Sequence, residues 1–88
     1  MSILKVSVAQ IKAARALLGW SQEKLAAASG VSIPTVKRLE AVDGALGGRP
    51  ETAEKLRTAL ENGGIVFLDE NGGGAGVRLR KGRPKQHR

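Results

Sequence analysis

Three serines and two glycines divide the N-terminal half of the chain into short helical segments. Ser7, Ser21 and Ser32 each precede a helix-forming run, where a serine hydroxyl accepts a hydrogen bond from a first-turn amide that lacks a partner in the helix. Gly19 and Gly30 follow the first two runs and suit the left-handed conformation that ends many helices. These signals predict helices over residues 8–18, 22–29 and 33–41, and none of them is long enough to span a bilayer.

Apolar residues in these segments recur at the helical period, which indicates that each helix buries one side. Pro50 suits a first helical turn and opens a fourth helix, expected from Glu51 to about Asn62, before Gly63 and Gly64. The expected buried positions are Val8, Ile11, Ala14, Leu17 and Leu18 in the first helix, Leu25, Ala26 and Ala28 in the second, Val36 and Leu39 in the third, and Ala53, Leu56, Ala59 and Leu60 in the fourth.

The period changes after the fourth helix. Residues 65–68 are a β-prone run, residues 69–76 are rich in glycine and turn formers, and residues 77–80 alternate apolar and basic side chains, so we expect a β-hairpin. The fold class is therefore mostly α: a four-helix domain over residues 1–63, a hairpin over 64–80 and a basic, disordered tail over 81–88. The glycine-rich loop lacks the lysine and the following helix of a phosphate-binding loop.

The pair of short helices joined through Gly30 has helix-turn-helix spacing. The segment from Val8 to Leu60 resembles the Cro/cI-type (XRE-family) helix-turn-helix domain, most closely over Ile11–Glu40. The similarity lies in the leading helix, the Ser-Gln that opens the second, the Leu-Ala pair, the glycine turn and the Leu-Glu that ends the third. The resemblance covers about 60% of the chain and leaves the hairpin and tail outside it.

The resemblance implies that the third helix enters the major groove of double-stranded DNA. Carried over by position, the residues facing DNA are Ser32, Ile33, Thr35, Lys37 and Arg38, with phosphate contacts from Gln22 and Arg49. Arg38 is expected to contact a guanine, although it could instead stay solvated or pair with Glu54. Gln22 could be only a surface residue. Ile33 and Pro34 occupy positions that often carry polar base-readers in the family, so phosphate contacts and DNA shape are expected to carry more of the recognition.

The positive charge of the chain is concentrated at its C-terminal end. Residues 1–76 hold nine basic and eight acidic side chains, whereas residues 77–88 hold six basic side chains and no acidic one, within a formal net charge of +7. The segment Lys81-Gly82-Arg83-Pro84-Lys85 resembles the AT-hook core, which implies minor-groove binding, with lysine where the AT-hook usually has arginine. Binding of phosphates alone, or a solvated tail, are the alternatives for Lys81, Arg83, Lys85 and Arg88.

The hairpin offers a surface for self-association. Residues 65–68 are apolar on both faces of their strand, so one face can cover the helical core while the other stays exposed. We expect homodimerisation through Val66, Leu68, Val77 and Leu79, with a hairpin that only covers its own core as the alternative.

These features predict a cytoplasmic, sequence-specific regulator that binds double-stranded DNA as a homodimer, a repressor or a repressor/activator. A DNA-binding antitoxin or adaptor whose C-terminal segment binds a partner protein is the second hypothesis, and an RNA or membrane-surface binder using only the tail is the third. The chain has no cysteine and its only histidine is His87, so we expect no enzyme activity, metal or cofactor.

Overall fold

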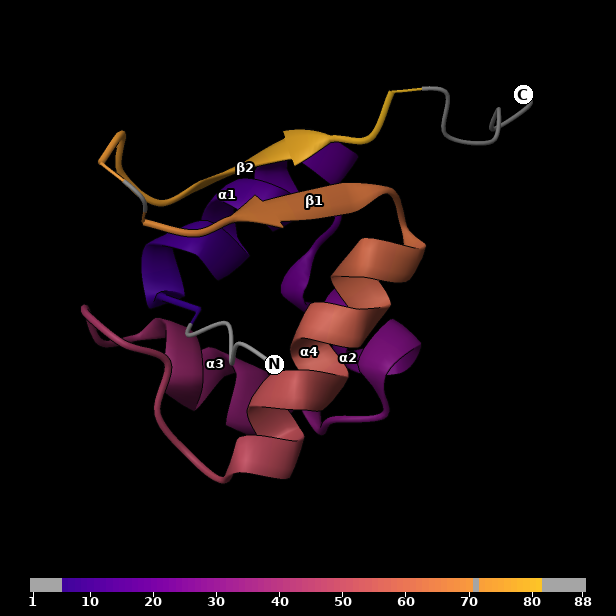
Figure 1. Cartoon of the computed structure of the whole chain (residues 1–88). Coiled ribbons are helices and arrows are strands. Elements are labelled where there is room, and N and C mark those ends of the chain that lie inside the picture. The colour runs from indigo at the N-terminus through magenta and orange to yellow at the C-terminus, as the bar shows by residue number, and fades with distance from the viewer. Residues whose placement is uncertain (1–5, 71, 82–88) are drawn as a thin grey trace.

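The computed structural model describes residues 6–70 and 72–81 of the chain. Within these ranges the elements are α1 (Val8–Leu18), α2 (Gln22–Ser29), α3 (Ile33–Glu40), α4 (Pro50–Asn62), β1 (Ile65–Leu68) and β2 (Gly76–Leu79) (Figure 1). Four helices followed by an antiparallel hairpin confirm the predicted fold class. Four bounds differ by one residue: α3 ends at Glu40, with Ala41 as its cap, α4 begins at Pro50, and β2 begins at Gly76 and ends at Leu79.

The predicted helix signals act as expected. The Ser7 hydroxyl accepts a hydrogen bond from the Gln10 amide at 3.1 Å, and the Gln10 side chain accepts one from the Ser7 amide at 2.9 Å, which completes a capping box. The hydroxyls of Ser21 and Ser32 cap α2 and α3 in the same way. Gly30 has a φ of 78°, so the turn between α2 and α3 requires the left-handed conformation that glycine adopts without strain.

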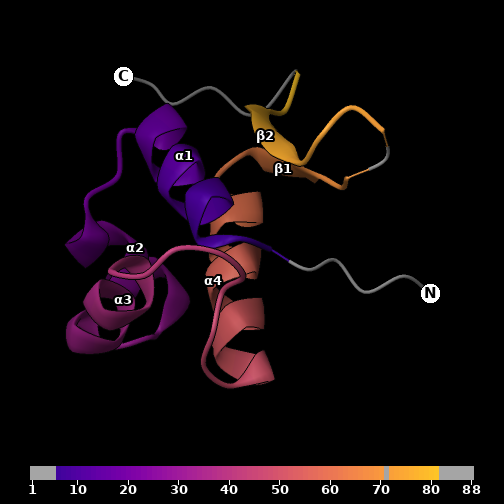
Figure 2. The same ribbon diagram turned by 90° about the vertical axis from the view of Figure 1, so that its left-hand side faces the viewer.

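The hydrophobic core lies where the four helices and one face of the hairpin meet. Its most deeply buried large side chains are Ile11, Leu25, Leu56, Leu60 and Ile65, with Val8 and Val36. α2 packs against α3 and α4, and the hairpin rests on α1 and on the C-terminal end of α4 (Figure 2). Two expectations about burial were wrong: Leu17 is 45% exposed, and Ala28 is also exposed, because no neighbouring element covers these side chains.

The connection from α4 to the hairpin depends on a close approach. A Cβ atom added at Gly63 would lie 2.9 Å from the Cζ2 atom of Trp20 and 3.0 Å from the Cδ1 atom of Leu18. The φ of Gly63 is −79°, so glycine is needed here for space and not for its backbone freedom. This contact brings the start of the hairpin against the C-terminal end of α1.

The two strands of the hairpin pair in one antiparallel register. Ile65 lies opposite Leu79 and Phe67 lies opposite Val77, and these four side chains face the helices. Because successive side chains alternate between the faces of a sheet, Val66, Leu68 and Arg78 lie on the outer face. The hairpin thus closes the helical core and shows solvent a face that is partly apolar.

Candidate nucleic-acid interface

The unit formed by α2, the Gly30 turn and α3 is held rigidly by buried contacts. Leu25 in α2 and Val36 in α3 are both fully buried, and Val31 in the turn is buried with them. Leu39 and Glu40 are also buried, so the inner side of α3 is fixed along most of its length. The opposite side of α3 is left to solvent.

This outer side of α3 carries the residues predicted to meet DNA. Ser32, Ile33, Lys37 and Arg38 are exposed and Thr35 is half-buried, so the structure brings all five together at one helix. The Ser32 hydroxyl accepts from the Thr35 amide at 3.3 Å and donates to the Thr35 hydroxyl at 2.9 Å. Ser32 therefore acts as a helix cap, and its proton is directed at Thr35, whose own hydroxyl proton remains able to donate.

The two basic side chains on this surface are not engaged elsewhere. Among residues 6–70 and 72–81 neither Lys37 nor Arg38 forms an ion pair, and the alternative of an Arg38–Glu54 pair is not seen. Both lie in the last turn of α3, where positive charge also suits the helix dipole. Their charge is thus available to an anionic ligand.

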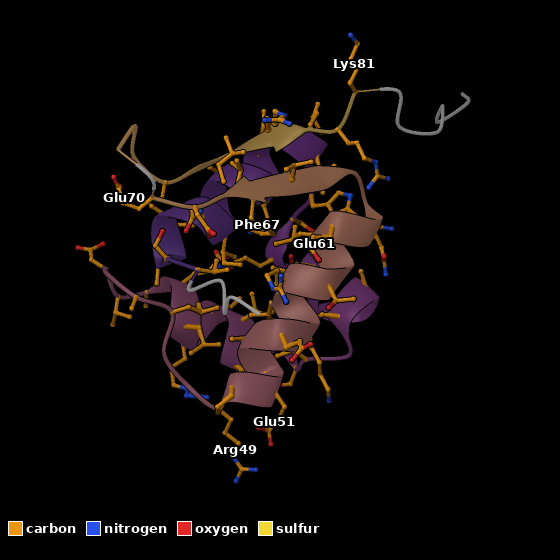
Figure 3. The ribbon with its side chains drawn as sticks, in the orientation of Figure 1. Arg49, Glu51, Glu61, Phe67, Glu70 and Lys81 are labelled. Carbon is orange, nitrogen blue, oxygen red and sulfur yellow. The ribbon has the colours of Figure 1, made fainter. Side chains whose placement is uncertain are left out.

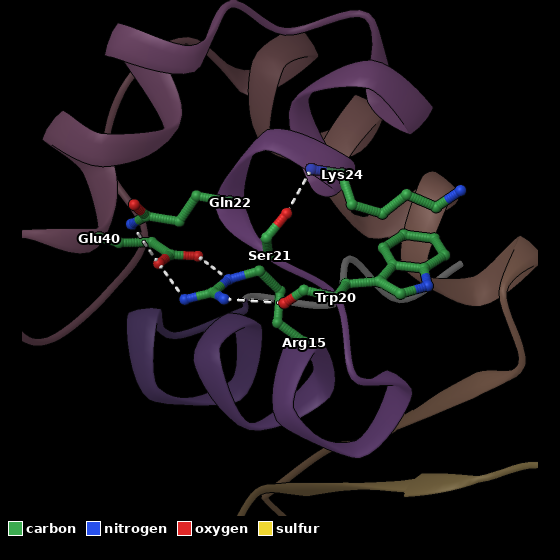
Figure 4. A network of polar contacts seen from close by, with 6 residues as sticks. All are labelled: Arg15, Trp20, Ser21, Gln22, Lys24 and Glu40. Atoms are coloured by element: carbon green, nitrogen blue, oxygen red, sulfur yellow. Dashed lines mark hydrogen bonds and ion pairs between the residues drawn. The ribbon is translucent and has the colours of Figure 1, made fainter.

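A buried ion pair fixes the C-terminal end of α3 (Figure 4). The guanidinium of Arg15 in α1 donates to both carboxylate oxygens of Glu40, at 2.9 Å and 2.7 Å, and donates from its third nitrogen to the Trp20 carbonyl at 3.0 Å. The amide nitrogen of Gln22 donates to the same carboxylate at 2.9 Å. The Glu40 side chain is only 3% exposed, against 19% for Arg15.

The charge state of this pair follows from competing effects. Burial alone raises the pKa of the Glu40 carboxyl, but hydrogen bonds from Arg15 and Gln22, together with the charges of Arg15 and Lys12, outweigh burial and lower that pKa. The hydrogen bond to Glu40 raises the pKa of Arg15, against the effect of its burial. Both groups are therefore charged at neutral pH.

The two residues predicted to contact phosphates lie on different elements. Gln22 is the first residue of α2 and is half-buried, with its amide nitrogen on Glu40. Arg49 precedes α4 and its side chain is 83% exposed, 4.0 Å from the carboxylate of Glu51 (Figure 3). That separation between two exposed groups gives a weak pair, which leaves Arg49 accessible.

The residues predicted at the dimer interface do not share one surface. Val66 and Leu68 lie on the outer face of the hairpin, whereas Val77 and Leu79 pack against the core. In the tail, Lys81 is exposed at the end of the hairpin, and Arg83, Lys85 and Arg88 lie outside the described residues.

Two polar contacts were missed by sequence reasoning. The Arg15–Glu40 pair was not predicted, and Glu40 entered the sequence argument only as part of the Leu-Glu that ends the third helix. The amide nitrogen of Gln10 donates to the carbonyls of Leu68 and Gly76, at 3.2 Å and 3.0 Å, and so ties α1 to both strands. The sequence shows that Arg15 and Glu40 each have apolar neighbours in their helices. That pattern does not indicate which residue either of them pairs with.

Comparison with known families agrees with this geometry. Residues 11–41, about a third of the chain, match the family model described as Helix-turn-helix. This segment is a helix-turn-helix domain. Such a domain implies DNA binding and is typically non-enzymatic. A search among curated proteins gave no match.

The described parts of the chain, residues 6–70 and 72–81, offer neither a membrane span nor a metal site. No helix there is long and apolar enough to cross a membrane. No group of three or more acidic or histidine side chains there is placed to hold a metal ion.

Proposed function

We propose that the protein is a sequence-specific transcriptional regulator, a repressor or repressor/activator, which binds double-stranded DNA as a homodimer on a pseudo-palindromic operator. The observation that carries this proposal is the two-sided character of α3. Val36, Leu39 and Glu40 fix its inner side, while Lys37 and Arg38 on its outer side form no ion pair with the described residues. A rigid helix with free positive charge on its open side suits the major groove, which is about 12 Å wide.

In this proposal α3 reads bases with few side chains. Arg38 donates two hydrogen bonds to O6 and N7 of a guanine, Ile33, 37% exposed, contacts a thymine methyl group, and Thr35 contacts a base edge or a phosphate. Lys37 contacts a phosphate or a base at the groove edge. Because Pro34 offers no hydrogen bond from its side chain, DNA shape contributes to the specificity.

Phosphate contacts from Gln22 and Arg49 hold the helix in register. A side-chain amide has two N–H groups, so Gln22 can donate one to Glu40 and the other to a phosphate. Its position would then be set by α3 itself, which couples phosphate contact to the placement of the reading helix. Arg49 extends from the start of α4 into solvent and needs no rearrangement to reach a phosphate.

In this proposal the basic tail contacts DNA beside the half-site that α3 reads. Lys81 leaves the hairpin at the end of the molecule remote from Arg49 (Figure 3). Insertion of the AT-hook-like segment into a minor groove would therefore take place on DNA flanking the contacted half-site. Its glycine, arginine and proline provide close approach, charge and an extended chain, which are what a narrow groove requires.

Selection of bound duplexes from a random pool, followed by titration with Arg38→Ala, tests the function. We expect the substitution to cost about 1–3 kcal/mol on the selected site and to relax the preference at one base pair. The matched control is Lys55→Ala, which removes an exposed charge from α4 and should leave base preference unchanged. Equal losses on selected and random duplex would make Arg38 a phosphate contact, and recovery of no preferred site would refute sequence-specific binding.

A further inference from the structure

We propose that two copies of the chain join through the free edge of β2, side by side and antiparallel, so that the acidic tip of each hairpin meets the basic base of the other. This rests on the proposed dimeric regulator and names the surface that forms the dimer. The occupant of the β2 edge is a second copy of the same chain. Four features of the described residues support it: the unpaired backbone groups of the β2 edge, the opposite charges at the two ends of the hairpin, the register that these charges favour, and an exposed leucine.

The edge of β2 has unpaired backbone groups. The Arg80 amide donates to the Gly64 carbonyl, so these two residues form a hydrogen-bonded pair. Because such pairs alternate along an antiparallel ladder, the N–H and C=O groups of Val77 and Leu79 point away from β1. No backbone group elsewhere in residues 6–70 and 72–81 pairs with them. On the β1 edge, by contrast, Ile65 and Phe67 are buried and α4 packs against the strand.

The hairpin has opposite charges at its two ends. Asp69 and Glu70 follow β1 at the tip, whereas Arg80 and Lys81 follow β2 at the base, and Figure 3 shows Glu70 and Lys81 at opposite ends of the hairpin. The paired positions between them span roughly 10 Å at about 3.3 Å per residue, so these charges do not meet within one hairpin. Two hairpins placed antiparallel bring each tip against the other base, and the attraction is repeated by symmetry.

Like charges select the register of this pairing. A two-fold axis at Arg78 would place this arginine opposite its own copy, and an axis at Leu79 would place Arg78 opposite Arg80. An axis at Val77 places Arg78 opposite Gly76 and Arg80 opposite Gly74 of the second copy. The Glu70 carboxylate already accepts a hydrogen bond from the Gly74 amide at 3.2 Å, so Arg80 would arrive beside that carboxylate. Directly opposed like charges destabilise a sheet, so the Val77 register is favoured.

An exposed leucine lies where the added strand would cover it. α1 packs mainly against β2. Gln10 donates a hydrogen bond to Gly76 at the tip end of the hairpin, and Leu18 lies close to Gly63 at its base end. Leu17 follows Gln10 by seven residues, about two helical turns, and so lies on the same side of α1, beside the base end of β2. It is nevertheless 45% exposed. The small, glycine-rich tip of the second hairpin would lie over it.

Charge reversal with rescue tests the pairing. We expect Glu70→Lys and Arg80→Glu each to weaken the dimer about ten-fold in sedimentation velocity, since two symmetric pairs turn repulsive. The chain carrying both changes should regain the wild-type dimerisation constant within about three-fold, because the pair is reformed across the interface. Glu54→Lys makes the same change of charge on α4 and should have no effect. A loosened tip in Glu70→Lys would not be rescued by a second change at Arg80.

A second pair of variants tests the covered leucine. Leu17→Lys should weaken the dimer about ten-fold with unchanged thermal unfolding of the monomer, whereas Val42→Lys, at a residue 55% exposed between α3 and α4, should not. A chain that is monomeric both free and on its DNA site, or a dimer indifferent to all of these changes, would overturn the inference. Sequence-specific binding that survives in such a chain leaves DNA recognition standing, while a charge-dependent dimer that selects no DNA site would refute the proposed function alone.

Discussion

The buried Arg15–Glu40 pair, which fixes the end of α3, should contribute strongly to the free energy of unfolding. Removing one member of a buried ion pair costs about 3–5 kcal/mol, because the remaining charge stays buried without a partner. Arg15 is 19% exposed and keeps its bond to the Trp20 carbonyl, so water can partly solvate it. We therefore expect Glu40→Ala to lower the free energy of unfolding by about 3 kcal/mol, the low end of that range.

This loss is large for a domain of this size. The total free energy of unfolding of an 88-residue chain is about 4–13 kcal/mol, and each kcal/mol corresponds to about 4–8 °C in Tm. Glu40→Ala should therefore lower Tm by about 12–24 °C. The chain offers a control in the half-buried, solvent-accessible pair between Arg57 and Glu61, one helical turn apart at 3.4 Å. Glu61→Ala should cost no more than about 0.5 kcal/mol.

Urea and thermal unfolding followed by circular dichroism measure both effects. The double variant Arg15→Met/Glu40→Leu should recover more than half of the loss, because it leaves no buried charge unpaired, although the Gln22 amide loses its acceptor and the Trp20 carbonyl loses its donor. A cost below about 1 kcal/mol for Glu40→Ala, or a double variant whose cost equals the sum of the single costs, would refute the view that the buried charge dominates.

Three further predictions concern pH, the hairpin and the tail. The pKa of Glu40 is lowered in the folded protein, so the pair contributes its full share to the free energy of unfolding above the ordinary glutamate pKa of about 4.3. That contribution is lost as the pH falls through the lower folded pKa. Glu40→Gln should therefore weaken the fall of the free energy of unfolding with decreasing pH in the acid range. Gln10→Glu keeps the acceptor of the capping box but removes both bonds to the hairpin, which should cost about 1–3 kcal/mol in urea unfolding and speed amide exchange in β1 and β2; unchanged exchange would contradict it. Deleting residues 81–88 should reduce the log–log salt slope of DNA binding by about 3–4, and an unchanged slope would exclude the tail from DNA.

The helices could be predicted from sequence because their signals are local. Ser7, Ser21 and Ser32 cap the helices that follow them, and the expected bounds hold to within one residue. The same periodicity predicts which residues lie on the outer side of α3, once Val36 and Leu39 are assigned to the core. Periodicity gives only the direction of a side chain and not the presence of a neighbour, which is why Leu17 and Ala28 were wrongly expected to be buried.

The polar contacts that organise the site could not be predicted in the same way. Arg15 and Glu40 are separated by 25 residues and Gln10 and Gly76 by 66, so each contact depends on how the whole chain packs. The two faces of the hairpin posed a similar problem. Alternation predicts that residues 65–68 divide into an inner and an outer pair, but only the packing against α1 and α4 determines that Ile65 and Phe67 are the inner ones.

Through these long-range contacts α1 positions both α3 and the hairpin, which could not be predicted from the sequence of α1 alone. Arg15 holds the carboxylate at the end of α3, and Gln10 holds both strands of the hairpin, so the proposed DNA-reading helix and the proposed dimer surface are fixed to one helix. In a dimer the spacing of the two reading helices is set by the path from α3 through α1 to β2. The half-sites should lie about 10–11 base pairs apart if both copies meet one face of DNA. Gln10→Glu, which removes the hydrogen bonds between α1 and the hairpin, should therefore weaken binding to an operator with two half-sites more than binding to a single half-site. Arg38→Ala should weaken both alike.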